Sequence, residues 1–414
     1  MSAFTRKDGR LYAVLAGLYL AQGIPTYLLL VALPPLMRES GASRTAIGLF
    51  SLLMLPLILK FAVAPLVDRF SPLPRLGHRR GWVIPTQLLV SALIAAMALF
   101  DPGQPGTLFA LCLAITILSS LQDIATDGYA VRHLSERTRA TGNAIQAGAV
   151  ALGVLIGGTL ALVLFHRLGW APTILLVAAL SLLPLLGAPW MRETPDGGEK
   201  TNDATPRPRA SLRRFFRNPN AWAILGFALT YRASEGLVRG MEGTFLVDMG
   251  LPVAWIGYLS GGAAATAGLI GTGIAAVVIA RMGLTATLVL LGTLRTLCFL
   301  GFTLSAAHIL PGIETAISAS AFQTLIRYME LVAIYSLFMK AAAGDQPGTD
   351  FTILACAELI VYLIGASVAG YLADTLGYPV LFGTATLISA VGIALALKQL
   401  RRFTRRQALQ PAVL

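Results

Sequence analysis

Two carboxylates, Asp123 and Asp127, interrupt a long apolar stretch with the sequence LSSLQDIATDGYAVRHL. Their spacing of four residues places both side chains on one face of a helix. A charge at the centre of a lipid bilayer costs roughly 2.5–3.5 kcal/mol, so such groups must be paired, neutral or exposed to water. Desolvation and mutual repulsion both favour the protonated acid, which suits reversible proton uptake. The pattern therefore indicates proton exchange, and an ion pair with a basic residue such as Lys60 is the structural alternative.

A second set of charges lies in the stretch TYRASEGLVRGMEGTF. Its members, spaced by three, four and three residues, are Arg232, Glu235, Arg239 and Glu242. This spacing predicts one helical stripe in which neighbours of opposite sign pair locally. Other apolar stretches contain Arg295, Gln323, Arg327, Glu330 and Glu358. Buried arginines offer paired donors for a carboxylate or phenolate, and their acidic partners can exchange protons. Salt bridges that only fix the packing of helices are the alternative.

The motif Gln22-Gly23-Ile24-Pro25 places an amide and a helix breaker inside an apolar helix. Such discontinuities often border substrate sites, and a simple kink is the alternative. The predicted substrate-binding residues are Gln22, Tyr27, Arg232, Arg239, Gln323 and Arg327. The predicted proton-coupling residues are Asp123, Asp127, Glu235, Glu330 and Glu358.

The elements that position these residues follow from the composition. The chain has 414 residues, of which 56% are hydrophobic and 13% charged, with a mean hydropathy of +0.72. A chain this apolar has too few polar residues to cover a soluble globule. Its apolar residues form twelve stretches long enough to cross a bilayer. These stretches lie near 11–36, 45–67, 82–100, 107–131, 141–165, 170–190, 221–247, 253–280, 284–306, 311–339, 349–373 and 377–397.

The distribution of charge orients these spans. Most of the 32 Lys and Arg residues lie in alternate inter-span segments and in the two ends of the chain. The opposite segments contain only Arg38, Arg44 and Arg167, which predicts that both termini are cytoplasmic. The formal net charge of +12 is therefore explained by topology, and no nucleic acid is expected as a partner.

A polar segment at 191–220, rich in Pro, Gly and charge, divides the chain into halves. A shift of 209 residues lays Gly17 on Gly226 and Gly41 on Gly250, which indicates two repeats of the same orientation. We predict an all-α integral membrane protein with twelve transmembrane helices in two parallel six-helix bundles. Its parts are an N-terminal bundle at 1–190, a cytoplasmic linker at 191–220, a C-terminal bundle at 221–400 and a basic cytoplasmic tail at 401–414.

Motifs of soluble enzymes are absent from the sequence. The three cysteines lie inside apolar stretches without a CxxC spacing, and the four histidines are too scattered to bind a metal together. No phosphate-binding loop ends in GK[ST], and no spacing suggests a Ser-His-Asp triad. We therefore predict no catalytic residue, cofactor or metal, and a protein that is not an enzyme.

The segment KFAVAPLVDRFSPLPRLGHRRGW resembles the signature loop of the major facilitator superfamily. In that family an acidic residue at a helix end meets an arginine and a neighbouring helix terminus, forming a latch that opens and closes during transport. The resemblance implies a gating latch of Asp68, Arg69, Arg79 and Arg80. A basic loop with an incidental Asp is the alternative, and the corresponding loop near Arg281 lacks an acidic residue.

Five segments are together similar to the AmpG-like branch of this superfamily, which includes muropeptide, acetyl-CoA and siderophore permeases. They are LYLAQGIPTYLL, KFAVAPLVDRFSP, LSSLQDIATDGYAV, RATGNAIQAGAVALGVLIGG and FRNPNAWAILGFALTYRASE. The compact length and the stretch RASEGLVRGMEG resemble the RhtX/FptX siderophore permeases more than the muropeptide permeases.

The resemblance to siderophore permeases implies import of a ferric siderophore, pyochelin- or rhizobactin-like, by proton-driven alternating access. The implied location is the bacterial inner membrane, and the implied partners are this small molecule and the lipid bilayer, with the protein a monomer. The alternative function is a permease for anhydro-muropeptides in cell-wall recycling.

Overall fold

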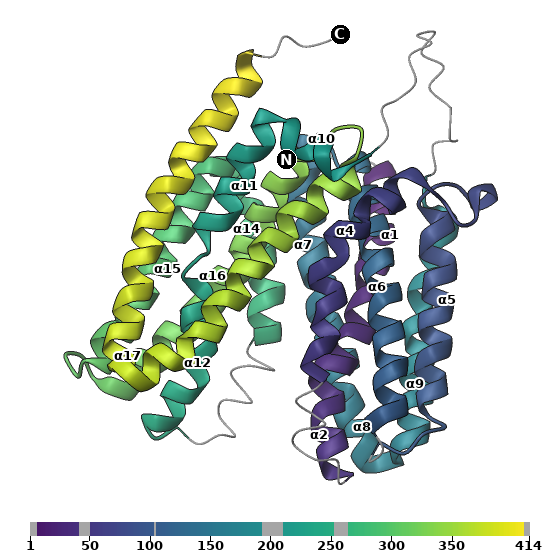
Figure 1. The fold of residues 1–414 in the computed structure, drawn as a ribbon, viewed down its shortest axis with the longest axis horizontal. Helices are drawn as coiled ribbons and strands as arrows, with labels where there is room; N and C mark the ends of the chain where they lie inside the picture. The colour runs from purple at the N-terminus through teal and green to yellow at the C-terminus, as the bar shows by residue number, and fades with distance from the viewer. Residues whose placement is uncertain (1–5, 41–49, 103–104, 193–209, 252–263, 410–414) are drawn as a thin grey trace. The chain divides into compact units, whose positions relative to one another are not determined.

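The chain is helical throughout the part that the computed structural model describes, namely residues 6–40, 50–102, 105–192, 210–251 and 264–409. No strand occurs in these ranges, and the helices follow the twelve predicted spans (Figure 1). The predicted all-α fold is therefore confirmed. Gly41, on which part of the repeat was inferred, lies outside the described residues, as do the beginnings of the second and eighth spans.

The chain forms two compact units. The first comprises Met1–Leu212 and Ala342–Thr352, and the second comprises Arg213–Ala341 and Ile353–Leu414. The helices of the first unit are α1 (Arg6–Tyr27), η1 (Leu28–Ala32), α2 (Leu33–Glu39), η2 (Phe50–Met54), α4 (Leu55–Arg69), η3 (Pro74–Leu76), α5 (Arg80–Met97), α6 (Pro105–His133), α7 (Glu136–Gly153), η4 (Val154–Leu160), α8 (Ala161–Leu168), α9 (Trp170–Leu182) and η5 (Leu183–Trp190).

The remaining helices are α10 (Leu212–Arg217), α11 (Pro219–Tyr231), α12 (Glu235–Asp248), α14 (Ala264–Met282), α15 (Leu284–Ala306), α16 (Gly312–Ala341) and α17 (Pro347–Leu409). The last of these contains the eleventh and twelfth spans, because Gly377 adopts a positive φ of 79° and ends the first of two helices there. The first turn of α17 belongs to the first unit, and the rest of it belongs to the second.

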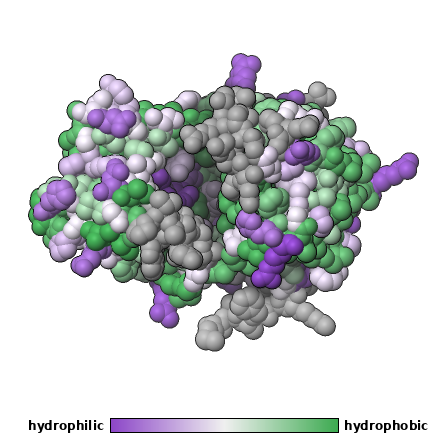
Figure 2. Space-filling model, turned by 90° about the horizontal axis from the view of Figure 1, so that it is seen from below, coloured by the Kyte–Doolittle hydropathy of each residue, from purple (hydrophilic) through white to green (hydrophobic). Residues whose placement is uncertain are grey.

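Each unit has its own apolar core, and large apolar side chains remain exposed on the outer faces of the helices. Examples are Leu88 and Leu89 on α5 and Leu387 and Val391 on α17. Apolar surface is visible in green between scattered hydrophilic side chains in Figure 2. Within the described residues, seven helices are long and apolar enough to cross a membrane. These exposed faces are suited to contact with lipid rather than water.

Several predicted spans contain irregular turns, and those of the first and seventh spans bear on predicted site residues. The first span is α-helical through Gln22 and Pro25 and then continues as the π-helical turn η1, so its irregularity begins three residues after the QGIP motif. The seventh span is broken, because α11 ends at Tyr231 and α12 begins at Glu235. The break lies at the charged stretch itself.

Glycines bring helix backbones into direct contact in both units. Gly23 of α1 lies against Gly153 of α7, and Gly236 of α12 lies against Gly365 of α17. A Cβ atom added to Gly236 would overlap the backbone carbonyl oxygen of Tyr362, which cannot move aside as a side chain can. The contact between the broken seventh span and α17 therefore depends on glycine.

The first prediction concerns this contact. We expect Gly236→Ala to destabilise the protein by about 1–3 kcal/mol, because overpacking forces the backbones of α12 and α17 apart. The matched control is Gly273→Ala on α14, where no atom lies within 4 Å of an added Cβ atom and alanine favours the helix. Thermal unfolding in detergent measures both. Equal melting temperatures for the two variants would contradict the packing.

Candidate functional site

The break in the seventh span places opposite charges at two helix ends. Arg295 of α15 donates a hydrogen bond from Nη2 to the carbonyl oxygen of Tyr231, the last residue of α11, at 2.6 Å. Glu235 is the first residue of α12. A helix favours a cation at its carboxyl end and an anion at its amino end, so each half-helix faces a charge of the favourable sign. Such paired half-helix ends frame binding sites in many transporters.

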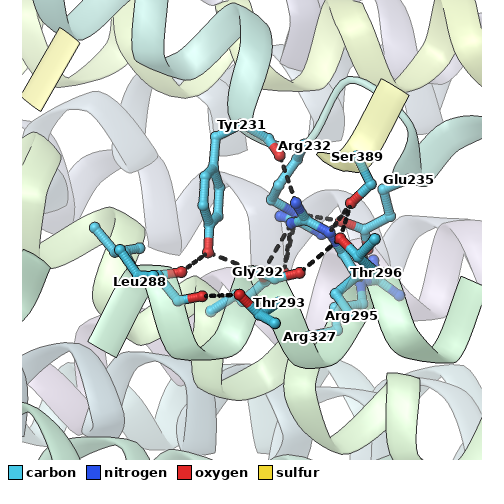
Figure 3. A network of polar contacts seen from close by, with 12 residues as sticks. Tyr231, Arg232, Glu235, Leu288, Gly292, Thr293, Arg295, Thr296, Arg327 and Ser389 are labelled. Atoms are coloured by element: carbon cyan, nitrogen blue, oxygen red, sulfur yellow. Dashed lines mark hydrogen bonds and ion pairs between the residues drawn. The ribbon is translucent and has the colours of Figure 1, made fainter. Parts of the chain in front are cut away.

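Arg232 lies in the turn between the two half-helices and joins carboxylates from three helices. Its guanidinium is hydrogen-bonded to Glu235 of α12 and to Glu358 of α17, and it lies 4.0 Å from a carboxylate oxygen of Glu330 on α16 (Figure 3 shows it beside Glu235). Arg232 and its three partners are buried. Without them, Arg232 would be an unpaired charge in an apolar bundle.

Arg295 and Glu330 form a second pair that is fully buried. Nη1 of Arg295 lies 2.8 and 3.0 Å from the two carboxylate oxygens of Glu330. The hydroxyl of Tyr231 also donates to Glu330 at 3.0 Å, and the Arg295 guanidinium lies over the Tyr231 ring, 4.7 Å from its centre. The prediction overlooked Tyr231 because its neighbours along the sequence give no sign of partners on α15 and α16.

Two arginines of this cluster are more accessible than the others. Nε of Arg327 lies 3.1 Å from Oε1 of Glu235, and 30% of the Arg327 side chain remains exposed. Arg239 pairs with Glu242 at 2.9 Å and is 24% exposed, whereas the side chains of Arg232 and Arg295 are 8% and 1% exposed. An incoming anion can therefore meet Arg327 or Arg239 without first breaking the buried pairs.

Gln323 lies one helical turn before Arg327 on α16 and shares its face. Its side chain is buried, and neither its amide nitrogen nor its amide oxygen has a hydrogen-bond partner. A buried amide without partners is costly, by about 1–3 kcal/mol, unless a ligand or water completes it. Gln323 and Arg327 together offer a neutral donor and acceptor beside a cation, which matches an amide next to a carboxylate.

The first unit contains the other predicted carboxylates. Asp123 forms an ion pair with Lys60 of α4, so the pairing that the sequence offered as an alternative is confirmed for this residue. Asp127 is buried and accepts a hydrogen bond of 3.0 Å from the hydroxyl of Tyr19 on α1. The two carboxylates therefore have different surroundings although they lie on one helix face.

The loop from Asp68 to Arg80 has the contacts that its motif implies. Asp68 pairs with Arg79 and accepts hydrogen bonds of 2.7 Å from both the backbone N–H and the hydroxyl of Thr349, in the first turn of α17. Arg69 and Arg80 donate to the backbone carbonyl oxygens of Ala210 and Met191, which belong to the described parts of the predicted linker, 191–192 and 210–220. These contacts are all within the first unit.

The predicted residues therefore fall into separate groups. Gln22 and Tyr27 lie half-buried on α1 in the first unit, where Nε2 of Gln22 has no hydrogen-bond partner. Arg232 and Arg327 are brought together around Glu235 in the second unit. The local i,i+3 pairing of Arg239 with Glu242 is also confirmed, although Arg232 lies in the turn rather than on the predicted helical stripe.

Known proteins resemble this chain in sequence and in fold. The profile described as Major Facilitator Superfamily matches residues 15–343. The anhydromuropeptide permease of Escherichia coli (strain K12) is 29% identical over 408 residues, covering 95% of this chain and 81% of the relative. The putative transporter AmpG 4 of Rickettsia conorii is 24% identical over 382 residues, covering 90% of this chain and 92% of the relative.

Solved structures of transporters share the fold. A bacterial homologue of the iron transporter ferroportin, in an outward-facing state, matches with a TM-score of 0.71 at 16% identity, covering 94% of this chain and 98% of that one. The transporter FucP, in an outward conformation, matches with a TM-score of 0.66 at 14% identity, covering 96% and 99%. At these identities the likeness is one of fold alone.

The second prediction concerns the Arg295–Glu330 pair. We expect Arg295→Met to destabilise the protein by about 3–5 kcal/mol, because it leaves Glu330 buried without a basic partner at short range. The double variant Arg295→Met with Glu330→Gln removes both charges and should recover most of this loss. Thermal unfolding of the single and double variants measures the coupling, and a double variant less stable than Arg295→Met would contradict it.

Proposed function

This chain belongs to the major facilitator superfamily, and we propose that it imports an anhydromuropeptide across a bacterial inner membrane, driven by the proton gradient. Family membership makes the chain a multi-pass membrane transporter of a small molecule rather than an enzyme. The substrate, the direction of transport and the coupling ion are the proposal. The likeness to an anhydromuropeptide permease over 95% of this chain supports the substrate class.

The observation that carries the proposal is the pair formed by Arg327 and Gln323. An anhydromuropeptide joins a sugar to a short peptide, and it therefore presents carboxylates next to amide groups. The partly exposed side chain of Arg327 can bind a carboxylate through two parallel hydrogen bonds. The amide of Gln323, which lacks partners, can bind the adjacent peptide group. We propose Arg239, whose side chain is 24% exposed, as a second anion contact.

The comparisons favour this substrate over the ferric siderophore that the sequence suggested first. One relative is an anhydromuropeptide permease and another is the putative transporter AmpG 4. Neither of them supports siderophore import. The RASEGLVRGMEG stretch, on which the siderophore expectation rested, is explained by the broken seventh span and its ion pairs. Those features do not depend on a siderophore.

We assign gating to the loop of Asp68, Arg69, Arg79 and Arg80. Asp68 binds the first turn of α17 through Thr349, and a carboxylate at a helix amino end is favoured by the helix dipole. Release of Thr349 frees the end of a helix that also carries Glu358 of the charge cluster. The loop can therefore respond to changes around Arg232 through a single continuous helix.

The third prediction tests the substrate contact. We expect Arg327→Gln to lower uptake of radiolabelled anhydromuropeptide about ten- to hundredfold, because a hydrogen bond to a charged group contributes about 1.5–3 kcal/mol. Uptake is measured in Escherichia coli cells that lack their own anhydromuropeptide permease and express this chain. The matched control is Arg217→Gln, an exposed arginine at the end of α10.

Three outcomes of this experiment would contradict the proposal. Wild-type cells that take up no anhydromuropeptide would refute the substrate, and accumulation of a ferric siderophore by the same cells would replace it. Equal uptake by Arg327→Gln and wild type would refute the role of Arg327. The amount of protein in the membrane and its melting temperature are measured for each variant, so a folding defect is recognised.

A further inference from the structure

The two units differ in the balance of their buried charges. In the second unit, four arginines pair with four glutamates: Arg232, Arg239, Arg295 and Arg327 with Glu235, Glu242, Glu330 and Glu358. Every one of these carboxylates has an arginine within ion-pair distance. In the first unit, the group around α6 contains three carboxylates, Asp68, Asp123 and Asp127, and two bases, Lys60 and Arg79. The excess is a single negative charge.

Asp127 is the carboxylate that accounts for this excess. It is 2% exposed, and in the described residues its only hydrogen bond comes from the neutral hydroxyl of Tyr19. Two basic groups act on it from neighbouring elements, and each has its own partner at ion-pair distance. Lys60 of α4 pairs with Asp123, and Arg79, at the start of α5, pairs with Asp68. On its own helix, Asp123 repels a charge on Asp127.

From this balance we infer that Asp127 is the residue that carries the coupling proton, an inference that rests on the proposed function. An ionised carboxylate without a basic partner is too costly in an apolar bundle, so the buried form is the neutral acid. The hydrogen bond from Tyr19 is compatible with this neutral form, because the carbonyl oxygen of a protonated Asp127 accepts a hydrogen bond as a carboxylate oxygen does. Asp123 is then a structural residue that pairs with Lys60.

The proton step at Asp127 needs no other reactant than water. When the site opens to the cytoplasm, the O–H bond of the acid breaks, water accepts the proton, and a carboxylate remains. The site then closes and reopens outward with the carboxylate solvated by water or a nearby cation, and the carboxylate takes up a new proton from water on the periplasmic side. This exchange couples the proton to the cycle of opening and closing.

The first test is spectroscopic and independent of the substrate. Infrared difference spectra of purified wild-type protein minus Asp127→Asn at pH 7 should contain the C=O band of a protonated carboxylic acid. The double variant Lys60→Met with Asp123→Asn should keep this band, because it removes an ion pair whose two charges cancel. A wild-type spectrum without a protonated acid at Asp127 would overturn the inference.

The second test is transport in proteoliposomes with anhydromuropeptide as the probe. Asp127→Asn imitates the neutral acid, so it should exchange substrate at equal pH within threefold of wild type. Its accumulation of substrate under a proton gradient directed into the proteoliposomes should be at least tenfold lower than that of the wild type. Asp127→Glu keeps an acid and should retain measurable accumulation. The Lys60→Met/Asp123→Asn variant should keep the wild-type ratio of accumulation to exchange within threefold.

The outcomes separate the inference from the proposed function. Gradient-driven accumulation by Asp127→Asn, or its specific loss in the Lys60→Met/Asp123→Asn variant, would overturn the role of Asp127. A wild-type protein that neither exchanges nor accumulates anhydromuropeptide would refute the proposed substrate instead. In that case the infrared spectra still decide whether Asp127 carries a proton. Melting temperatures of all variants show whether each one is folded.

Discussion

A charge inside a membrane protein must be neutralised where it lies, and the second unit is organised around this constraint. Arg232 is buried, and Glu235, Glu358 and Glu330 from three helices surround it. Arg232 makes these contacts from the turn between α11 and α12, where the seventh span is broken. The close approach of Gly236 to α17 brings Glu358 within reach. Packing and charge thus depend on each other.

The two units combine the same kind of helix contact with different electrostatics. Gly23 and Gly153 in the first unit correspond in function to Gly236 and Gly365 in the second, because both pairs let two helix backbones touch. The second unit is rich in arginine and electrically balanced, which suits the binding of an anion. In the first unit, the group around Asp127 has one more carboxylate than bases, which suits the exchange of a proton. The proposed roles, anion binding in the second unit and proton exchange in the first, match this difference.

Much of the fold and part of the site could be predicted from the sequence. Hydropathy defined the spans because a segment that crosses lipid must be an apolar helix whose backbone groups are hydrogen-bonded internally. The i,i+3 spacing identified the pairs Arg232–Glu235 and Arg239–Glu242. The break at residues 232–234 could not be predicted, because it is stabilised by Arg295, far along the chain. The difference between Asp123 and Asp127 was also hidden, since Lys60 and Tyr19 approach them from other helices.

Proton flux through the purified protein tests the account most directly. Proteoliposomes that contain a pH-sensitive dye, with no pH gradient at the start, are supplied with anhydromuropeptide on the outside. The account predicts that the interior acidifies when the substrate is added and that an uncoupler abolishes the signal. Substrate entry without acidification would contradict proton coupling, and the absence of both entry and acidification would contradict the proposed substrate.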